Sequence, residues 1–490
     1  MSYPKKIVHW IGDKEIDSKG KKFFAKHNSA TGEVLAEVAR GNHEDAKAAI
    51  KWAESAYGVW AGTPVAKRSK ILLNLALLIH KRRDELAEIV AIESGKPKKI
   101  ALQEVDAAVK CGLFFVKEGS RIFNAREKLV SATAGRKVEL VRQPTGVGAL
   151  ITPFNNPSTG VAWKLFPALL CGNTVIVKSH EYTPYIAIWY AKALQEAGIP
   201  AGVMNVVQGL GREAGRALVK DERVTFVSFT GSFATGADIL KNTAERLAKV
   251  SIEAGGKNPF VVCDDADLDR AADIAVDSAF IDAGQRCSAA SRIIVSAPIY
   301  DEFKKIFLEK VSCLKVGVTD DCDYGAMISK KRMNFVLRAV DTATKRGAKV
   351  LTGGKRLDGQ GYFIEPTVLE NLSMDEQFSQ EEIFGPAVVL YRAKDFQDAL
   401  RLANFSRFKL SGAIHTKSAK RAQDFIQRYV SGVVRVNGPT HGSEPHMPFG
   451  GVGLSGNGWR EPGSKALDFY ADWKQVSYER IVLKKGRVKI

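Results

Sequence analysis

The chain has no long apolar run, and this absence excludes a membrane protein of the usual helical kind. Its longest apolar stretch, residues 71–79, is about half of the ~18 residues that a membrane-spanning helix needs, and Asn74 interrupts it. We therefore expect a buried core helix there and no membrane partner. No apolar stretch of signal-peptide length follows the first six residues, so the cytoplasm is the expected location.

Cysteine and histidine are also scarce. The six cysteines are scattered without a C-x-x-C pair, and the eight histidines show no spacing typical of metal ligands. This pattern argues against a zinc site and against a dense disulfide framework. We expect no bound metal.

Half of the formal charge of +18 lies at the two ends of the chain. Residues 1–26 hold seven lysines against three acids, and residues 474–490 hold six basic residues against one acid. Lysines scattered without interleaved aromatic residues are typical of a solvated surface, so nucleic acid is not expected as a partner. Attraction of anionic substrates and cofactors is the milder interpretation.

Residues 146–255 alternate short β-rich runs with amphipathic stretches. This pattern predicts an α/β unit with a parallel, doubly covered sheet and a cofactor crevice at the carboxyl ends of its strands. The expected strands and helices are, in chain order, 147–152, helix 161–170, 174–178, helix 185–197, 204–208, helix 212–219, 225–229, helix 234–247 and 249–253. A second such unit follows, with strands expected over 259–263, 292–295, 387–391 and 432–436.

The glycine fingerprint of ordinary dinucleotide-binding folds is missing. The segment from Gly209 to Gly215 has one residue too many for G-x-G-x-x-G. In the turn at residues 229–236, Gly231 allows close backbone approach and Ser232 offers a hydroxyl at a helix N-terminus. An ordinary capped helix is the alternative interpretation of this turn.

Cys287 is the candidate nucleophile. It follows a helix expected over 268–280 and a turn at Gly284, and it lies beside Arg286, whose charge we expect to favour the thiolate. The alternative is that this cysteine is only a small buried apolar residue, as most free cysteines are.

Three sequence motifs favour the interpretation of Cys287 as a nucleophile. The sequences FTGS (229–232), EAGGK (253–257) and FIDAGQRC (280–287) resemble, in order and spacing, the NAD(P)-dependent aldehyde dehydrogenase family. The resemblance runs from near Asn28 to the PFGG sequence at 448–451. It implies the aldehyde dehydrogenase fold, with a Rossmann-like NAD(P)-binding domain (1–124 and 146–255), an α/β catalytic domain (256–447) and a small β oligomerisation arm (125–145 and 469–490). Strand character near 136–142 and 474–490 fits such an arm, so a homodimer or homotetramer is expected.

The resemblance also implies roles for individual residues. Cys287 would attack the aldehyde, and the Asn155 amide with the Cys287 backbone N–H would hold the oxyanion. After hydride transfer to the cofactor, Glu253 would activate the water that hydrolyses the thioester. Asn155 follows the strand that ends near Thr152, although a simple Asn-Pro turn is the alternative there. The family usually has an aromatic residue where Asn156 stands, so a more polar substrate mouth is expected.

The cofactor residues follow in the same way. Lys178 and Glu181 match the family's contacts to the adenosine ribose, and an acid there would repel a 2′-phosphate, so NAD is expected and NADP is the second candidate. His180 replaces a residue that is usually small, and with Lys178 it would soften this discrimination. Glu382 and Phe384 resemble the pair that holds the nicotinamide ribose. The other expected cofactor contacts are Thr152, Phe154, Gly211, Phe229, Gly231, Ser232 and Gly255.

The substrate is expected to be a short aldehyde with a distal carboxylate. The run 284–292 and residues 162–164 most resemble the α-ketoglutaric and succinic semialdehyde branch of the family. Trp163 stands where some succinic semialdehyde enzymes have an arginine, so Arg286 or His441 would have to meet the carboxylate. Two alternatives stay open. A coenzyme A acylating dehydrogenase is disfavoured by Glu253, and a non-catalytic binding protein of the same fold is disfavoured by the intact set of Asn155, Lys178, Glu253 and Cys287.

Overall fold

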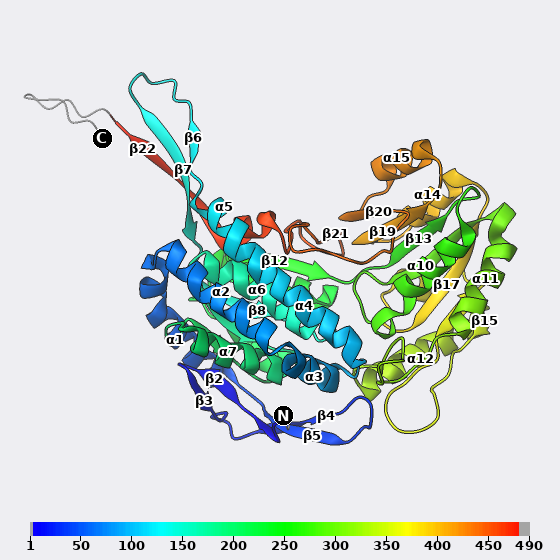
Figure 1. Cartoon of the computed structure of the whole chain (residues 1–490), viewed down its shortest axis with the longest axis horizontal. Coiled ribbons are helices and arrows are strands. Elements are labelled where there is room, and N and C mark those ends of the chain that lie inside the picture. Colours follow the sequence, from blue (N-terminus) through cyan, green and yellow to red (C-terminus); the bar gives the residue numbers. More distant parts are fainter. Residues whose placement is uncertain (1–2, 480–490) are drawn as a thin grey trace, which may run out of the picture.

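The computed structural model describes residues 3–479 and contains two seven-stranded sheets in separate halves of the molecule (Figure 1). The first sheet has the strand order β12-β11-β8-β9-β10-β2-β3. Five consecutive strands of this order run parallel: β8 (Val147–Ile151), β9 (Thr174–Lys178), β10 (Met204–Val206), β11 (Phe226–Gly231) and β12 (Lys249–Ala254). The antiparallel pair β2 (His9–Ile11) and β3 (Lys14–Ile16) extends the edge beside β10.

Helices cover this first sheet on both faces, as its fully buried parallel strands require. They are α1 (His43–Gly62), α2 (Val65–Lys81), α3 (Arg83–Ser94), α4 (Lys98–Phe114), α6 (Pro157–Leu170), α7 (Tyr185–Ala197), α8 (Arg216–Lys220) and α9 (Phe233–Thr243). The apolar run 71–79 lies in α2, where Leu72, Leu75 and Ile79 are fully buried, so the predicted core helix is confirmed. Within residues 3–479, no helix combines the length and the apolar character that a membrane crossing requires.

Most predicted elements of this unit are confirmed with small shifts. β9 and α7 have the predicted bounds, and α6 begins earlier than expected, at Pro157, because proline suits the first position of a helix. Two helix predictions are wrong in detail. The segment expected to be one helix over 212–219 is a π-helical turn (Gly211–Gly215) followed by α8. The helix expected to continue to Leu247 ends at Thr243, and Leu247 adopts a left-handed conformation with φ 53°.

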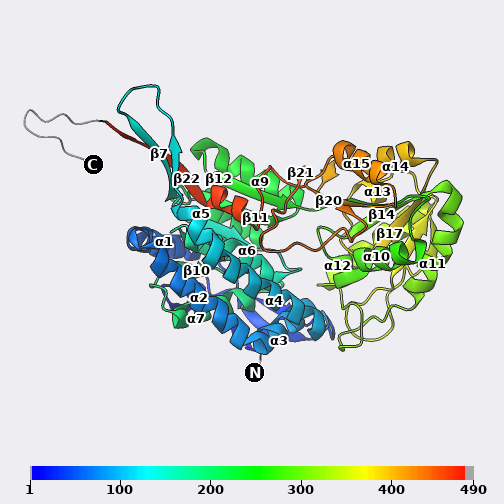
Figure 2. The same cartoon turned by 45° about the horizontal axis from the view of Figure 1, so that its top comes forward.

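The second sheet has the strand order β15-β16-β17-β14-β13-β19-β20. Its strands are β13 (Asn258–Val262), β14 (Ala290–Ser296), β15 (Lys349–Thr352), β16 (Thr367–Glu370), β17 (Ala387–Ala393), β19 (Ser411–His415) and β20 (Val433–Val436). All pairs are parallel except the edge pair of β15 with β16. The four strands predicted in this unit are therefore confirmed as β13, β14, β17 and β20. The helices α10 (Leu268–Phe280), α11 (Tyr300–Ser312), α12 (Lys330–Lys345), α14 (Phe396–Asn404) and α15 (Ala419–Arg428) pack around it (Figure 2).

A separate three-stranded antiparallel sheet projects from the body of the molecule, in cyan and red in Figures 1 and 2. It contains β6 (Glu127–Leu129), β7 (Lys137–Pro144) and β22 (Ala471–Tyr478), and β7 pairs with β22 over its whole length. The strand character predicted near 136–142 is confirmed by β7. Of the other predicted segment, 469–490, residues 480–490 lie outside the described part of the chain.

The chain passes from the first sheet to the second through residues 255–257, between the end of β12 and the start of β13. The carboxyl ends of β8, β11 and β12 therefore lie next to the second sheet. Gly256 fits this crossing because a Cβ there would lie 2.4 Å from the backbone oxygen of Cys287. This close approach brings the two halves of the expected site together.

Candidate active site

Cys287 is held in place by an unusual backbone segment. After α10 the chain makes a left-handed turn in which Asp282 (φ 54°), Ala283 (φ 56°) and Gly284 (φ 63°) all have positive φ. Only glycine fits the last position, because a Cβ there would lie 2.3 Å from the backbone oxygen of Gly385. The Asn258 amide then donates to the Cys287 carbonyl oxygen at 2.8 Å and fixes the residue from the other side.

Glu253 lies at the end of β12, close to Cys287. Its Oε1 atom is buried without a hydrogen-bond partner among residues 3–479. Burial raises the pKa of Glu253 to about 7, although a hydrogen bond to the Cys287 thiol and the charge of Lys164 act in the opposite direction. A carboxylate in this condition suits general base catalysis near neutral pH.

The expected effect of Arg286 on the thiol is present, but burial and Glu253 outweigh it. Burial raises the pKa of Cys287 well above its ordinary value, and the Glu253 carboxylate raises it further. Arg286 lowers this pKa only slightly, because its Nε donates to the Asp282 carboxylate at 2.5 Å and its charge is neutralised there. Both burial and the Glu253 charge favour the protonated thiol of Cys287 beside this buried carboxyl group.

A buried polar group that the sequence analysis missed lies near Glu253. The Lys164 ammonium contacts Glu461 at 2.7 Å and Ser228 at 2.9 Å, and Tyr470 donates to Glu461 at 2.5 Å. Lys164 favours the charged form of Glu253, whereas Glu461 disfavours it. A lysine within the otherwise apolar helix α6 was a detectable signal, but nothing in the sequence connects it with Glu461, almost 300 residues away.

The largest cavity near Cys287 has a volume of about 720 Å³ and extends along the carboxyl ends of the first sheet. All eleven predicted cofactor residues line it, together with Asn155, Glu253 and Cys287. The eleven are Thr152, Phe154, Lys178, Glu181, Gly211, Phe229, Gly231, Ser232, Gly255, Glu382 and Phe384. Arg212, Arg216 and Arg332 line it as well, and the sequence analysis did not find them.

One end of this cavity is charged. The Lys178 ammonium donates to the backbone oxygen of Ser179 and lies 4.0 Å from the Glu181 carboxylate. Burial lowers the pKa of Lys178 to about 8. Burial opposes ionisation of Glu181, but the neighbouring His180 and Lys178 outweigh it and lower the pKa of this carboxyl. Burial also lowers the pKa of His180 to about 4, so this histidine is charged only in the acidic range in which Glu181 titrates, and at pH 7 it adds no charge for a phosphate.

The other end of the cavity is built around Glu382. The Gly256 N–H donates to Glu382 Oε1 at 3.0 Å, and burial raises the pKa of this carboxyl to about 7. A Cβ at position 255 would lie 2.1 Å from the Glu382 carboxylate, so a larger residue there would displace this side chain. Phe384 has a positive φ of 54° and packs edge-on against Phe154, with ring centroids 5.6 Å apart.

This cavity has the features that a dinucleotide needs. The Ser232 hydroxyl caps the first turn of α9, and the N-terminus of this 11-residue helix borders the cavity beside Gly231. A helix N-terminus attracts phosphate groups, and carboxylates such as Glu181 accept from ribose hydroxyls. No group of three or more potential ligands among residues 3–479 is arranged to hold a metal ion.

A second cavity, of about 220 Å³, also reaches Cys287. Trp163, Arg286 and His441 line it, so the three predicted substrate residues lie together. His441 contacts the Asp277 carboxylate at 2.8 Å. The two cavities meet at five shared residues: Pro153, Asn155, Thr230, Glu253 and Cys287.

Comparisons with known proteins agree with this geometry. The model of the aldehyde dehydrogenase family matches residues 16–476. The chain is 36% identical to 2,5-dioxopentanoate dehydrogenase of Saccharolobus solfataricus over 96% of this chain and 99% of that protein. It is 38% identical to α-ketoglutarate semialdehyde dehydrogenase of Haloferax volcanii over 91% and 93% of the two chains. Among solved structures, betaine aldehyde dehydrogenase of Staphylococcus aureus in complex with NAD⁺ superposes with a TM-score of 0.93 at 32% identity, over 96% of this chain and 94% of that one.

The chain therefore belongs to the aldehyde dehydrogenase family. It is an NAD(P)-dependent oxidoreductase that converts aldehydes to carboxylic acids, and the fold predicted from its motifs is confirmed.

Proposed function

We propose that the enzyme oxidises a short aldehyde carrying a distal carboxylate, with NAD as acceptor, and that Cys287, Glu253 and Asn155 carry out the chemistry. The observation that supports this proposal most strongly is the meeting of the two cavities at these three residues. A substrate entering through the smaller cavity and a cofactor in the larger one would both reach the thiol.

The electrostatics of the site suggest the order of proton transfers. Glu253, with its pKa of about 7, accepts the thiol proton as the Cys287 sulfur forms a bond to the aldehyde carbon. The Asn155 amide and the Cys287 N–H stabilise the resulting oxyanion. The bound cofactor accepts the hydride, which leaves a thioester on Cys287. Once its proton has passed to solvent, Glu253 takes a proton from the water that attacks this thioester and releases the acid.

The smaller cavity supports a short anionic substrate. The Arg286 guanidinium is mostly buried and uses Nε for Asp282, and no partner of its Nη atoms is found among residues 3–479. These Nη donors suit a carboxylate. The relatives named for 2,5-dioxopentanoate and α-ketoglutarate semialdehyde act on aldehydes of this class.

An aldehyde pair tests this substrate class. We expect 2,5-dioxopentanoate to be preferred over pentanal in kcat/KM, and Arg286→Gln to reduce the preference by about 10- to 100-fold, the range of one charge-assisted hydrogen bond. His441→Asn tests the second candidate contact, with His446→Asn in the same loop as its matched control, since His446 is exposed and outside the cavity lining. A preference unchanged in both Arg286→Gln and His441→Asn would reject carboxylate recognition by these residues.

The domain roles follow from the same arrangement. We assign NAD(P) binding to residues 1–124 and 146–255, catalysis to 256–447, and assembly into a homodimer or homotetramer to 125–145 and 469–490. The projecting sheet of β6, β7 and β22 supports the last assignment, because Val130 and Trp473 are exposed apolar residues on it and in the turn beside it. Replacing Trp473 by serine should lower the mass measured by light scattering. The need to keep Cys287 reduced supports the cytoplasm as the location, which cell fractionation would test.

A further inference from the structure

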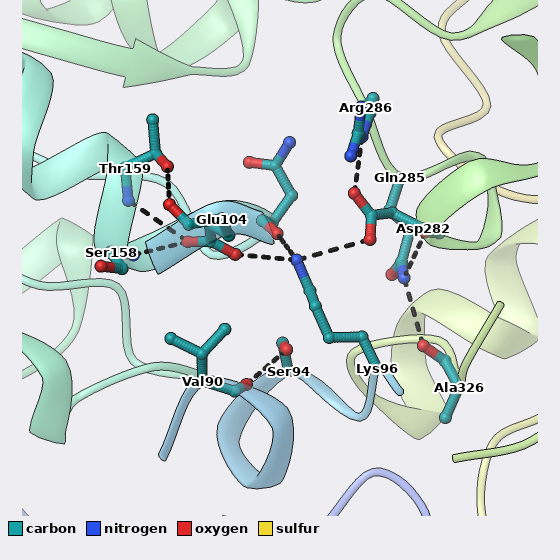
Figure 3. Close-up of polar contacts among 11 residues, drawn as sticks. Val90, Ser94, Lys96, Glu104, Ser158, Thr159, Asp282, Gln285, Arg286 and Ala326 are labelled. Carbon is teal, nitrogen blue, oxygen red and sulfur yellow. Dashed lines mark hydrogen bonds and ion pairs between the residues drawn. The ribbon is translucent and has the colours of Figure 1, made fainter. Parts of the chain in front are cut away.

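Three buried charged side chains and the partly exposed Arg286 form a row of alternating charge between the two halves of the enzyme (Figure 3). Glu104, Lys96, Asp282 and Arg286 follow one another in this row. Lys96 lies 3.0 Å from Glu104 and 3.4 Å from Asp282, and the side chains of all three are at least 95% buried. The row begins in the helical layer of the first sheet and ends one residue before Cys287.

Lys96 also contacts the loop of the expected oxyanion donor. Its ammonium donates to the backbone oxygen of Asn155 at 2.7 Å. Glu104, held by Lys96 through one carboxylate oxygen, accepts with the other from the N–H groups of Ser158 at 2.7 Å and Thr159 at 3.2 Å. An anion at this helix N-terminus fixes the start of α6. The turn that carries Asn155 is therefore held at the residue itself and at the helix that follows.

On the other side, Lys96 contacts the segment that presents the nucleophile. Asp282 is the first residue of the left-handed turn before Cys287, a conformation that is costly for residues other than glycine. Burial disfavours the charge on Asp282, but Arg286 and Lys96 outweigh this effect and lower its pKa to about 2. An ionised carboxylate between two cations thus anchors the strained turn.

The turn that carries Lys96 is itself docked on the second half of the molecule. The Ala326 N–H donates to the Gly95 carbonyl oxygen at 2.8 Å, and a Cβ at Gly325 would lie 1.9 Å from that oxygen. Gln285, two residues before the nucleophile, donates to the Ala326 carbonyl oxygen at 3.2 Å. Lys96 therefore lies where both halves contact each other, and no step of the proposed reaction uses it.

We infer that Lys96 is a positioning residue that sets the Asn155 amide relative to the Cys287 sulfur by bridging the Asn155 backbone and Asp282. It touches neither the substrate nor the cofactor in this role. The inference rests on the roles proposed above for Asn155 and Cys287. A misplacement of about 1 Å between reacting groups costs about 100-fold in rate, so removal of the bridge should slow the first chemical step by about 10- to 100-fold.

The test measures reduced nicotinamide in the first turnover by stopped flow, with saturating aldehyde and cofactor. Lys96→Met should slow this phase and leave the KM for NAD unchanged. Lys110→Met replaces an exposed lysine on α4, the helix that follows Lys96; it is the matched control and should behave as the unmodified enzyme. Asp282→Asn is the second variant, because asparagine tolerates the left-handed conformation and the change removes only the negative charge that faces Lys96 and Arg286. It should slow the same phase even if Lys96→Met does not fold.

A double-mutant cycle separates positioning from general stabilisation. In an Asn155→Ala background the donor to be positioned is gone, so Lys96→Met should cost much less than it costs alone. A lowered Tm with an unchanged first-turnover rate in both Lys96→Met and Asp282→Asn would overturn the inference. Losses that multiply fully in the double variant would overturn it as well. An Asn155→Ala enzyme that keeps its full rate would instead reject the proposed oxyanion role, and the inference with it.

Discussion

Replacement of Glu253 by glutamine tests both proton transfers proposed for this residue. The carboxylate is buried, its Oε1 atom has no hydrogen-bond partner among residues 3–479, and burial raises its pKa to about 7. General bases typically contribute about 10²- to 10⁴-fold, so Glu253→Gln should lower the steady-state rate by roughly this factor. Since glutamine cannot accept a proton from the Cys287 thiol or from water, formation and hydrolysis of the thioester should both slow, and the thioester that forms should persist.

The activity should depend on pH through the ionisation of Glu253. Only the ionised form of Glu253 is a base, so activity should rise with pH through about 7 in the unmodified enzyme. In Glu253→Gln this rise should disappear. Glu382 has a pKa raised to a similar value by burial, which makes Glu382→Gln the necessary control. That variant should keep the rise near pH 7 while binding the cofactor more weakly.

The assay combines steady-state absorbance of reduced nicotinamide with mass spectrometry of the quenched protein. We expect Glu253→Gln protein to carry the mass of the acyl group on the peptide that contains Cys287. The reasoning would be refuted if the activity of Glu253→Gln still rises with pH near 7. It would also be refuted if the first turnover of this variant is fast, later turnovers are slow and no acyl enzyme is detected. If the rise near pH 7 disappears in Glu382→Gln, the titrating group is Glu382 and not Glu253.

Two further variants test the cofactor cavity. In Gly255→Ala the added methyl group would lie 2.1 Å from the Glu382 carboxylate and displace it. The KM for NAD, measured by steady-state titration, should rise by at least about tenfold, and Tm should change little because the carboxylate can move. An unchanged KM would contradict the expected contact of Glu382 with the cofactor. Glu181→Gln removes the charge that disfavours a 2′-phosphate, while Arg212 remains at the same cavity, so kcat/KM for NADP should rise relative to NAD by about 10-fold or more. Equal cofactor ratios before and after the Glu181 change would show that another feature sets the preference.

Much of the fold follows from local sequence patterns. The predicted bounds of β9 and α7 match because an apolar β-branched run and a Gly198-Ile199-Pro200 stop signal define them within the segment itself. The end of α9 was placed too late, since apolar periodicity continues to Leu247 while the chain turns at Thr243 to reach β12. Periodicity alone does not detect such an end.

Part of the candidate site was also predictable from the sequence, and part was not. Motifs placed Cys287, Glu253 and the cofactor residues, because each lies at a strand end or turn with a recognisable spacing. The ion-pair partners of the charged side chains could not be predicted from the sequence. No sequence pattern indicates that Asp282, four residues earlier, neutralises Arg286. No pattern connects Lys96 with Asn155. These contacts join segments that are distant along the chain or depend on a left-handed turn, so only the three-dimensional structure reveals them.

The most direct test of the account is the absorbance of reduced nicotinamide when the enzyme is mixed with NAD and 2,5-dioxopentanoate, succinic semialdehyde or an uncharged aldehyde, beside Cys287→Ala. The account predicts formation of the acid with at least one of the semialdehydes and complete loss of the signal in the variant. Reduction of NAD that persists in Cys287→Ala, or no reduction with any aldehyde in the unmodified enzyme, would contradict it.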